Sequence, residues 1–203
     1  MPRIAFIASG AFELAPLESR RGQRDWVCVA KGPGWRLARA AAEEAAAQGP
    51  LAAMVSMGVC GALAEDLRPG DIVVDSEARA PRCDLAFRRG RVVSQDRVAV
   101  SIDEKRRLAQ EGIAVEMESA AVREVAQRNG VPFYVVKAVS DTAAETLPFD
   151  FNEYRDEAGR FQLRRIGLAA MCRPWLIPKL MHMRRQANFA AGKLGEFLVH
   201  CEF

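Results

Sequence analysis

Short apolar runs alternate along this chain with segments whose polar and apolar positions repeat at helical spacing. The runs of strand length are Ile4–Ala8, Trp26–Ala30, Leu51–Met57, Asp71–Ser76, Ile113–Val115 and Phe133–Val139. Helical patterns cover Trp35–Gln48 and Ser119–Arg128, and a glycine closes each of them. Because several strands are apolar on both faces, the pattern predicts an α/β fold with a mixed, mostly parallel central sheet flanked by helices.

Polar segments directly follow three of the predicted strands. They are Ser9–Glu13, the glycine loop Gly58–Gly61 and Ser140–Thr142. Ligands of such sheets bind at the carboxyl ends of the strands. We therefore expect these three loops to line one binding site.

The composition excludes several classes of protein. The 203 residues suffice for one domain, which we expect to span residues 1–203, and a formal net charge of +3 gives no reason to expect nucleic acid as a partner. No apolar run is long enough to span a bilayer, and residues 1–8 are interpreted as a strand and not as a signal peptide. Five cysteines without a CxxC pair indicate a reducing, cytoplasmic location and argue against a disulfide framework or a zinc site. The chain has two histidines, both near its C-terminal end, which are few for a histidine-based metal centre or a serine-hydrolase triad. No metal or other cofactor is expected.

The last third of the chain, from about residue 158, differs in character. It carries eight basic residues against two acidic ones, interleaved with apolar side chains. Pro174 and Pro178 divide it into separate helical pieces. One interpretation is a pair of helices that cover the core and turn an arginine-rich face to solvent. The alternative is a peripheral surface for an anionic membrane or a lipid-like substrate.

Four motifs, in the right order, resemble those of the purine nucleoside phosphorylase and methylthioadenosine/adenosylhomocysteine nucleosidase superfamily. They are the opening strand and loop Ile4–Glu13, the glycine loop Ser56–Leu63 followed by Pro69–Val74, the V-E-M-E stretch Ala114–Ala121, and the strand with its S-D motif Val136–Ala143. The resemblance runs from about Ile4 to Tyr154. It implies a phosphorylase/hydrolase-like three-layer fold, an enzyme that cleaves nucleosides, and a homodimer or higher homo-oligomer.

The transition state for breaking the bond between ribose and a purine nitrogen resembles an oxocarbenium ion. The reaction therefore requires an acid for the departing base, a group that holds the sugar hydroxyls, and a nucleophile on the opposite face of the sugar. By the resemblance, Asp141 would protonate or hydrogen-bond N7 of the leaving purine, oriented by Ser140, and Glu13 would position or activate the attacking water. Glu118 would bind the ribose hydroxyls. The further substrate contacts that it implies are Met117 against the sugar, close backbone approach at Gly58, Val59, Cys60 and Gly61, the backbone of Val98 at the base, and Phe149 or Phe151 over the base.

Each of these residues also has a structural interpretation. Asp141 is a residue type that often caps helices, and Glu118 suits the first turn of a helix. Glu13 is equally compatible with a surface position. Cys60 is interpreted as a small apolar residue and not as a nucleophile, because no histidine is near it in the sequence. The joint occurrence of these residues favours the catalytic interpretation.

Water is the expected nucleophile, because a glutamate at position 13 would repel phosphate and no phosphorylase-type G-D-P-x-R loop occurs. Phosphate as co-substrate is the alternative. The stretch between Ser76 and Val115 is shorter than in typical members, and Met57 and Val59 replace small polar residues. With the basic, apolar end of the chain, these departures suggest the hopanoid-associated branch, which acts on an adenosyl lipid. A second alternative is a nucleoside-binding module without turnover.

Overall fold

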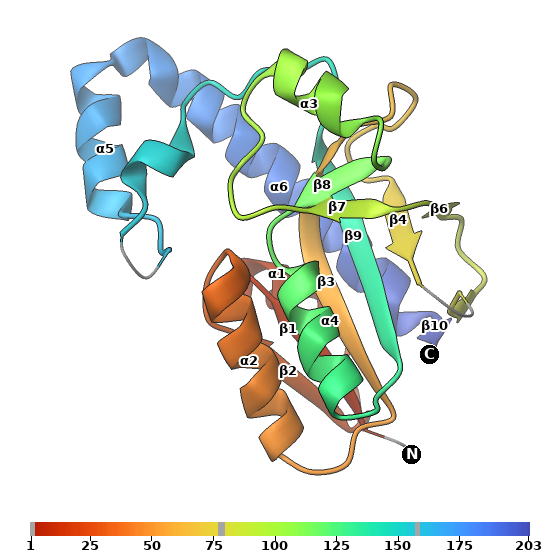
Figure 1. Ribbon diagram of the computed structural model, residues 1–203. Coiled ribbons are helices and arrows are strands. Elements are labelled where there is room, and N and C mark those ends of the chain that lie inside the picture. Colours follow the sequence, from red (N-terminus) through yellow and green to blue (C-terminus); the bar gives the residue numbers. More distant parts are fainter. Residues whose placement is uncertain (1–2, 77–79, 157–158) are drawn as a thin grey trace.

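The computed structural model describes residues 3–76, 80–156 and 159–203, and its centre is one mixed sheet (Figure 1). Along this sheet the strands follow the order β2-β1-β3-β9-β4-β6. Their bounds are β1 Ile4–Ala8, β2 Trp26–Ala30, β3 Ala53–Ala62, β9 Phe133–Asp141, β4 Ile72–Asp75 and β6 Arg88–Arg89. The pairs β1–β2, β1–β3 and β3–β9 are parallel, whereas β4 runs antiparallel to β9. The carboxyl ends of β1, β3 and β9 therefore meet at one edge.

Helices cover both faces of the sheet and form a three-layer arrangement. On one face, α1 (Ala11–Glu18) and α6 (Ile177–Val199) pack on the even-numbered side chains of β9. On the other face lie α2 (Trp35–Ala47) and α4 (Ser119–Arg128). The predicted α/β fold with a mostly parallel sheet is confirmed.

The alanine-rich sequence of α2 explains how closely this helix approaches the sheet. Ala38, Ala41, Ala42 and Ala45 recur at helical spacing, and none of them is exposed. Their small side chains let α2 pack tightly against β1, β2 and α4. The helix thereby fixes the preceding turn at Gly34 beside the carboxyl ends of the strands.

Shorter elements complete the described structure. A side branch of the sheet consists of β8 (Ala114–Glu116), which pairs with β3, and β7 (Val92–Ser94). The other elements are β5 Arg82–Cys83 paired with β10 Cys201–Glu202, α3 Ile102–Leu108, the 3-10 turns η1 Phe151–Tyr154 and η2 Pro174–Leu176, and α5 Leu163–Cys172. Among the described helices, none is long and apolar enough to cross a membrane.

All three predicted loops belong wholly or in part to regular elements instead. The prediction that Gly58–Gly61 forms a loop is wrong, because β3 continues to Ala62 and pairs with β9 along this whole stretch. Likewise, Ser140 and Asp141 are the last residues of β9, and Glu13 lies in the first turn of α1. A strand tolerates Gly58 and Gly61 here because both positions receive a carboxylate from a neighbouring element, as described next.

Candidate active site

The carboxylate of Glu13 is buried at the start of α1, facing β3. Its Oε2 accepts hydrogen bonds from the Ser9 amide (2.8 Å), the Ser9 hydroxyl (2.7 Å) and the Gly10 amide (3.0 Å). From the described residues, its Oε1 accepts one hydrogen bond, donated by the Val59 amide at 2.8 Å. Oε1 thus retains a lone pair for a further donor such as water. Because only 2% of Glu13 is exposed, the interpretation as a surface glutamate is wrong.

Lys137 holds a buried group of carboxylates together. Its Nζ lies 2.8 Å from Glu116 Oε2 and 3.5 Å from Glu118 Oε2, and it donates to the Met57 carbonyl at 3.3 Å. Glu118 Oε1 in turn accepts a hydrogen bond of 2.9 Å from the Gly34 amide. Glu13 also acts electrostatically on both Lys137 and Glu118. We call Glu13, Glu116, Glu118 and Lys137 the Lys137 cluster; it contains three carboxyl groups and one ammonium.

Burial and charge shift the pKa values within the Lys137 cluster in different directions. Burial raises the pKa of Glu118 to about 7; Lys137 opposes this rise and the charge of Glu116 adds to it. Glu116 is equally buried, but the Lys137 ammonium and hydrogen bonds lower its pKa to about 2. Burial depresses the pKa of Lys137, yet the surrounding carboxylates outweigh it and leave this pKa above its ordinary value. At neutral pH, therefore, Glu116 and Lys137 are charged and Glu118 titrates.

Asp141 forms a second ion pair at the end of β9. Lys105 Nζ, from α3, donates to Asp141 Oδ2 at 2.5 Å and to the carbonyl oxygens of Thr142 and Glu145 at 2.7 and 3.0 Å. The Ser140 hydroxyl lies 2.8 Å from Asp141 Oδ1. Lys105 is 1% exposed and the Asp141 side chain 14%. Asp141 is thus oriented from both oxygens, and it does not cap a helix.

Two glycines allow carboxylates from both sites to approach the backbone of β3. A Cβ built on Gly58 would lie 2.6 Å from Glu13 Oε1, and one on Gly61 would lie 3.0 Å from Asp141 Oδ2. Gly58 also has a φ of 139°, a value that side chains disfavour. The two glycines are three residues apart on one strand, or roughly 10 Å at about 3.3 Å per residue. The two predicted catalytic carboxylates therefore meet the same strand within the length of a nucleoside.

The other residues of the predicted glycine segment have backbone or core roles. Val59 contributes its amide to Glu13, and the Cys60 carbonyl lies 3.1 Å from the Ser140 hydroxyl. Burial raises the pKa of the Cys60 thiol, which agrees with its interpretation as an apolar residue and not a nucleophile. Met57 is buried in the core beneath α1 and α6, so its presence does not make the site apolar.

A cavity of about 520 Å³ opens beside Ser140 and Asp141. Its walls come from the segment after β9 and from the first half of α6. The lining residues are Ser140, Asp141, Glu145, Thr146, Leu147, Pro148, Pro178, Lys179, His182, Met183 and Gln186. The volume suits a small-molecule ligand, and the apolar residues of the lining are Leu147, Pro148, Pro178 and Met183.

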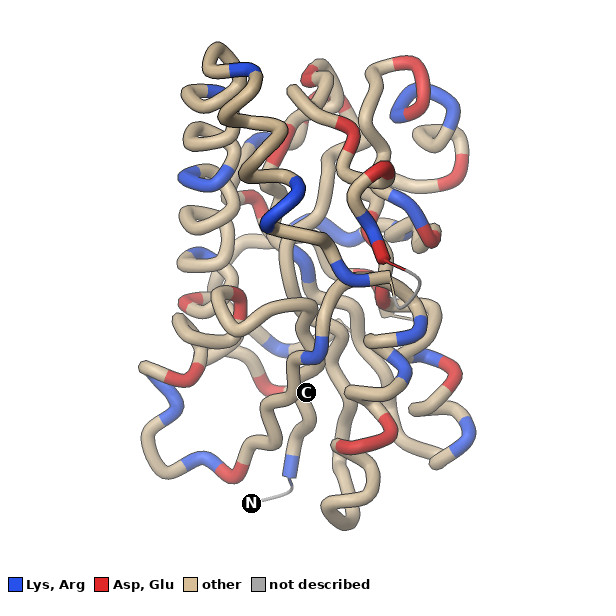
Figure 2. The backbone as a smooth tube through the Cα atoms, turned by 90° about the vertical axis from the view of Figure 1, so that its left-hand side faces the viewer, with Lys and Arg blue, Asp and Glu red and all other residues tan. Residues whose placement is uncertain are grey.

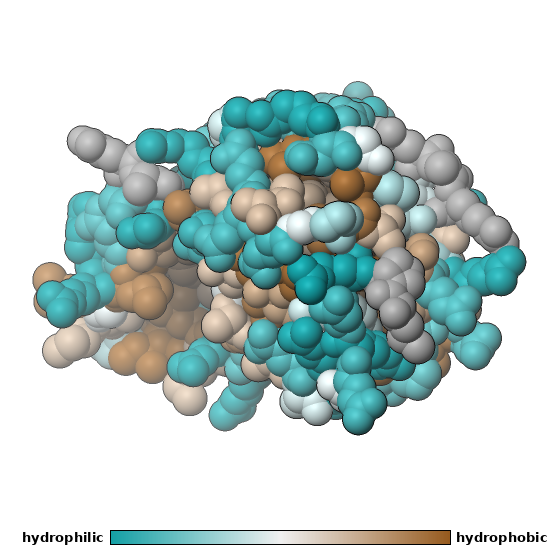
Figure 3. Space-filling model, turned by 90° about the horizontal axis from the view of Figure 1, so that it is seen from below, coloured by the Kyte–Doolittle hydropathy of each residue, from teal (hydrophilic) through white to brown (hydrophobic). Residues whose placement is uncertain are grey.

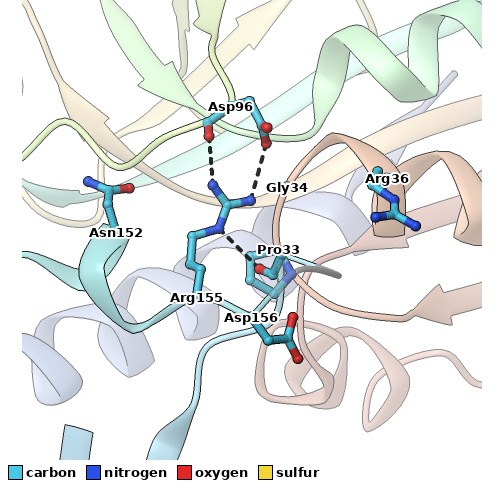
Figure 4. A pocket seen from close by; sticks show the side chains of 8 residues that line it. Pro33, Gly34, Arg36, Asp96, Asn152, Arg155 and Asp156 are labelled. Atoms are coloured by element: carbon cyan, nitrogen blue, oxygen red, sulfur yellow. Dashed lines mark hydrogen bonds and ion pairs between the residues drawn. The ribbon is translucent and has the colours of Figure 1, made fainter. Parts of the chain in front are cut away.

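A smaller cavity of about 240 Å³ lies near Gly34, and Figure 4 shows that Arg155 crosses it. The Arg155 guanidinium donates to the Asp96 carbonyl at 2.6 Å and to the Asp96 carboxylate at 3.2 Å, and Nε donates to the Gly159 carbonyl at 3.1 Å. Arg155 is thus already engaged by protein groups. Since the Gly34 amide is bound to Glu118, this turn does not offer that donor to an anion either.

The predicted base contacts Val98 and Phe149 are engaged by other residues of the protein. The Val98 amide donates to Asn152 Oδ1 at 2.8 Å, and Asn152 Nδ2 donates to the Val98 carbonyl at 3.1 Å. Asn152 therefore occupies the backbone groups expected to bind the base. Phe149 is buried and packs on the rings of Phe151 and Tyr154, with centroids 5.4 and 4.5 Å away, and lines neither described cavity.

Two site residues were missed by the sequence analysis. Lys137 is the lone charged residue in the apolar run of β9, and a lone charge in such a strand signals a buried ion pair. Lys105 gives no such signal, because it sits in the charged segment Ile102–Leu108 among exposed residues. Only the packing of α3 against the end of β9 reveals it. Met117, in contrast, lies partly exposed between β8 and α4, where its amide donates to Glu118 at 3.3 Å.

A model of the Phosphorylase superfamily matches residues 10–80 and 74–171 of this sequence. The chain therefore belongs to the phosphorylase superfamily, a family of enzymes. The resemblance of its four motifs to this superfamily is confirmed.

Solved structures with a similar fold are nucleosidases and a related hydrolase. Helicobacter pylori 5′-methylthioadenosine/S-adenosylhomocysteine nucleosidase is 18% identical, with a TM-score of 0.71 over 98% of this chain and 96% of that chain. Futalosine hydrolase of the same organism is 17% identical, with the same TM-score and coverage. S-adenosylhomocysteine nucleosidase from Streptococcus pyogenes is 23% identical, with a TM-score of 0.60 over 71% of this chain and 85% of that chain.

Proposed function

We propose that this protein cleaves the N-glycosidic bond of a purine nucleoside by hydrolysis and releases the free base. The observation that carries the proposal is the unequal charge at the two ends of the site. The Lys137 cluster holds more carboxylates than ammonium groups, whereas Asp141 is paired with the buried ammonium of Lys105. Heterolysis of this bond leaves positive charge on the ribose and negative charge on the base. The carboxylates of the Lys137 cluster match the positive charge on the ribose, and the ammonium of Lys105 matches the negative charge on the base.

Each group has a role in this reaction. Asp141, in its carboxylic-acid form, hydrogen-bonds or protonates N7 of the purine as the C–N bond breaks, and Lys105 stabilises the carboxylate that this proton transfer leaves. Glu118 accepts hydrogen bonds from the ribose hydroxyls. Glu13 uses its remaining Oε1 lone pair to hold the attacking water, and its carboxylate accepts the proton that the water loses as the C–O bond forms. Ser140 and Lys105 are positioning residues for Asp141, because they bind its two oxygens.

Water is favoured over phosphate by the same charges. A phosphate dianion would have to approach the carboxylates of the Lys137 cluster, which repel it. The donors that might offset this repulsion near Gly34 are used within the protein, since Glu118 binds the Gly34 amide and Asp96 binds Arg155. Of the arginines between positions 79 and 97, Arg79 lies outside the described residues.

The substrate that we favour is an adenosine with a substituent on its 5′ carbon. Relatives of the same fold are named for 5′-methylthioadenosine and S-adenosylhomocysteine. The cavity of about 520 Å³ beside Asp141 gives such a substituent room, and its apolar lining residues suit a hydrocarbon group. An adenosyl lipid is therefore the second candidate substrate, and the apolar residues of the lining favour it.

A panel of adenosines with different 5′ substituents tests the proposed function. We expect free adenine from 5′-methylthioadenosine or from an analogue with a longer apolar 5′ group, at the same rate with and without phosphate. The measurement is chromatography of the base. Release that depends on phosphate would make the protein a phosphorylase, and tight binding without any release would make it a binding module.

The rate of base release should rise with pH through about 7. Glu118 must be ionised to accept hydrogen bonds from the ribose, and its raised pKa means that the protonated form dominates below about 7. In kcat/KM, Glu118→Gln should remove this rising limb and cost about tenfold to a hundredfold. Glu124→Gln, which alters an exposed glutamate of α4, the helix that begins directly after Glu118, is the control and should keep the wild-type profile. An unchanged pH profile in Glu118→Gln would refute the assignment.

A further inference from the structure

Apolar side chains are exposed on one lobe of the molecule that stands apart from the sheet. The lobe consists of residues 160–185 and contains α5, η2 and the first part of α6 (Figure 1). Six of its large apolar residues are exposed: Leu163 (76%), Leu168 (63%), Met171 (75%), Trp175 (66%), Ile177 (40%) and Met181 (52%). We call residues 160–185 the basic arm.

The exposure of these residues extends along a whole helix. No residue of α5 is buried, and its main contacts are with its chain neighbours η1 and η2. In Figure 3, apolar residues gather on the side of the view where α5 lies, beside the hollow that separates them from the body. A contiguous apolar patch of this kind marks an interaction surface.

The basic arm is charged with one sign only. It carries seven basic residues and no acidic residue: Arg160, Arg164, Arg165, Arg173, Lys179, Arg184 and Arg185. Figure 2 shows the molecule from this side. All charged residues along α5 and the first part of α6 are Lys or Arg there, and none is Asp or Glu. Within the described part of the chain, no carboxylate pairs with Arg164, Arg173, Lys179, Arg184 or Arg185. Their charge is therefore available to an anionic partner.

We propose that the basic arm docks on the surface of an anionic lipid bilayer. Interleaved arginines and large apolar residues on helices are the pattern that lies in the interface of a bilayer, with aliphatic and aromatic side chains inserted and cations at the headgroups. Trp175 sits at the elbow between α5 and α6, where an indole ring would reach the headgroup level. A second copy of the arm is a poorer occupant, because it brings like charges together and supplies no carboxylate.

The position of the arm connects this surface with the candidate active site. Pro178 and Lys179 belong to the basic arm and also line the cavity beside Asp141. A docked arm therefore places the opening of that cavity next to the bilayer. This feature suits a substrate with a hydrocarbon group, but docking itself does not depend on the reaction.

Vesicle co-sedimentation tests the proposal with the full chain. We expect binding to vesicles of phosphatidylcholine with phosphatidylglycerol, and little binding to phosphatidylcholine alone or in high salt, which screens the charges. Arg184→Gln with Arg185→Gln should weaken binding by about tenfold or more, since each cation near an anionic surface contributes substantially. Arg106→Gln with Arg107→Gln, an adjacent exposed pair on α3, is the matched control and should bind like wild type.

The apolar side of the surface needs a separate pair of variants. Met171→Ser with Trp175→Ser removes two exposed side chains and should lower vesicle binding by about tenfold or more. Phe12→Ser, an exposed residue outside the arm, should have no effect. Equal binding of arm and control variants would overturn the proposal. A dimer in light scattering that the arm variants dissociate, without any vesicle binding, would also overturn it and assign the surface to a second copy.

Discussion

Asp141→Asn is expected to lower the rate of base release by about a hundredfold to ten-thousandfold, the range typical for the loss of a general acid. The substitution removes the carboxyl group at the base but keeps one oxygen that can accept from Lys105, while the amide nitrogen can donate to the Ser140 hydroxyl. Binding of the nucleoside should weaken much less than kcat falls. The rate is measured as free base under saturating substrate.

A loss of fold has to be separated from a loss of chemistry in this variant. Asp141→Asn leaves the ammonium of Lys105 without its counter-charge, so some destabilisation is expected. Lys105→Met combined with Asp141→Asn removes both charges and should restore stability in part without restoring activity. If Asp141→Asn retained activity within tenfold of wild type, the role assigned to Asp141 would be wrong.

Lys137→Met should lower the free energy of unfolding by about 3–5 kcal/mol, the cost of leaving a buried charge unpaired. Lys137 and the Glu116 side chain are each 1% exposed, so solvent cannot replace the lost ammonium. Glu116 would keep the Glu118 amide and the Ser119 amide and hydroxyl as donors, which are all uncharged. Urea titrations followed by circular dichroism measure the effect.

The pH dependence of this loss has a definite sign. Because Lys137 holds the pKa of Glu116 near 2 in the folded protein, the pair contributes stability above the ordinary pKa of glutamate. That contribution is lost as pH falls towards 2. The difference between wild type and Lys137→Met should therefore be largest near neutral pH and shrink in acid. Adding Glu116→Gln should recover part of the loss at neutral pH; equal stability of wild type and Lys137→Met at pH 7 would refute the buried pair.

The sequence predicted the fold well wherever one periodicity governed a whole element. The helix Ser119–Arg128 was predicted with its observed bounds, and the strand from Phe133 was two residues short at its end. The error at Gly58–Gly61 has a physical cause, because glycine ordinarily interrupts strands. In this protein the missing side chains make room for Glu13 and Asp141, and cross-strand pairing with β9 maintains the extended backbone.

The carboxylates of the candidate site were predicted from the sequence, and its two lysines were not, although Lys137 carries a signal as the charge within an apolar strand. Glu13, Glu118 and Asp141 belong to motifs that can be read along the chain. Their partners Lys137 and Lys105 depend on which faces of β9 and α3 turn inward, which the local sequence does not determine for α3. The backbone of Val98 was expected to be open to the base, but Asn152 is 54 residues away and its contact is set by tertiary packing.

A crystal structure with a bound 5′-substituted adenosine analogue tests the central claim most directly. One nucleoside should lie between the two charged groups, with its base within about 3 Å of the Asp141 carboxylate and its ribose hydroxyls within the same distance of Glu118. A nucleoside bound in the Arg155 cavity without contact to Asp141, or contacting one of these carboxylates alone, would contradict it.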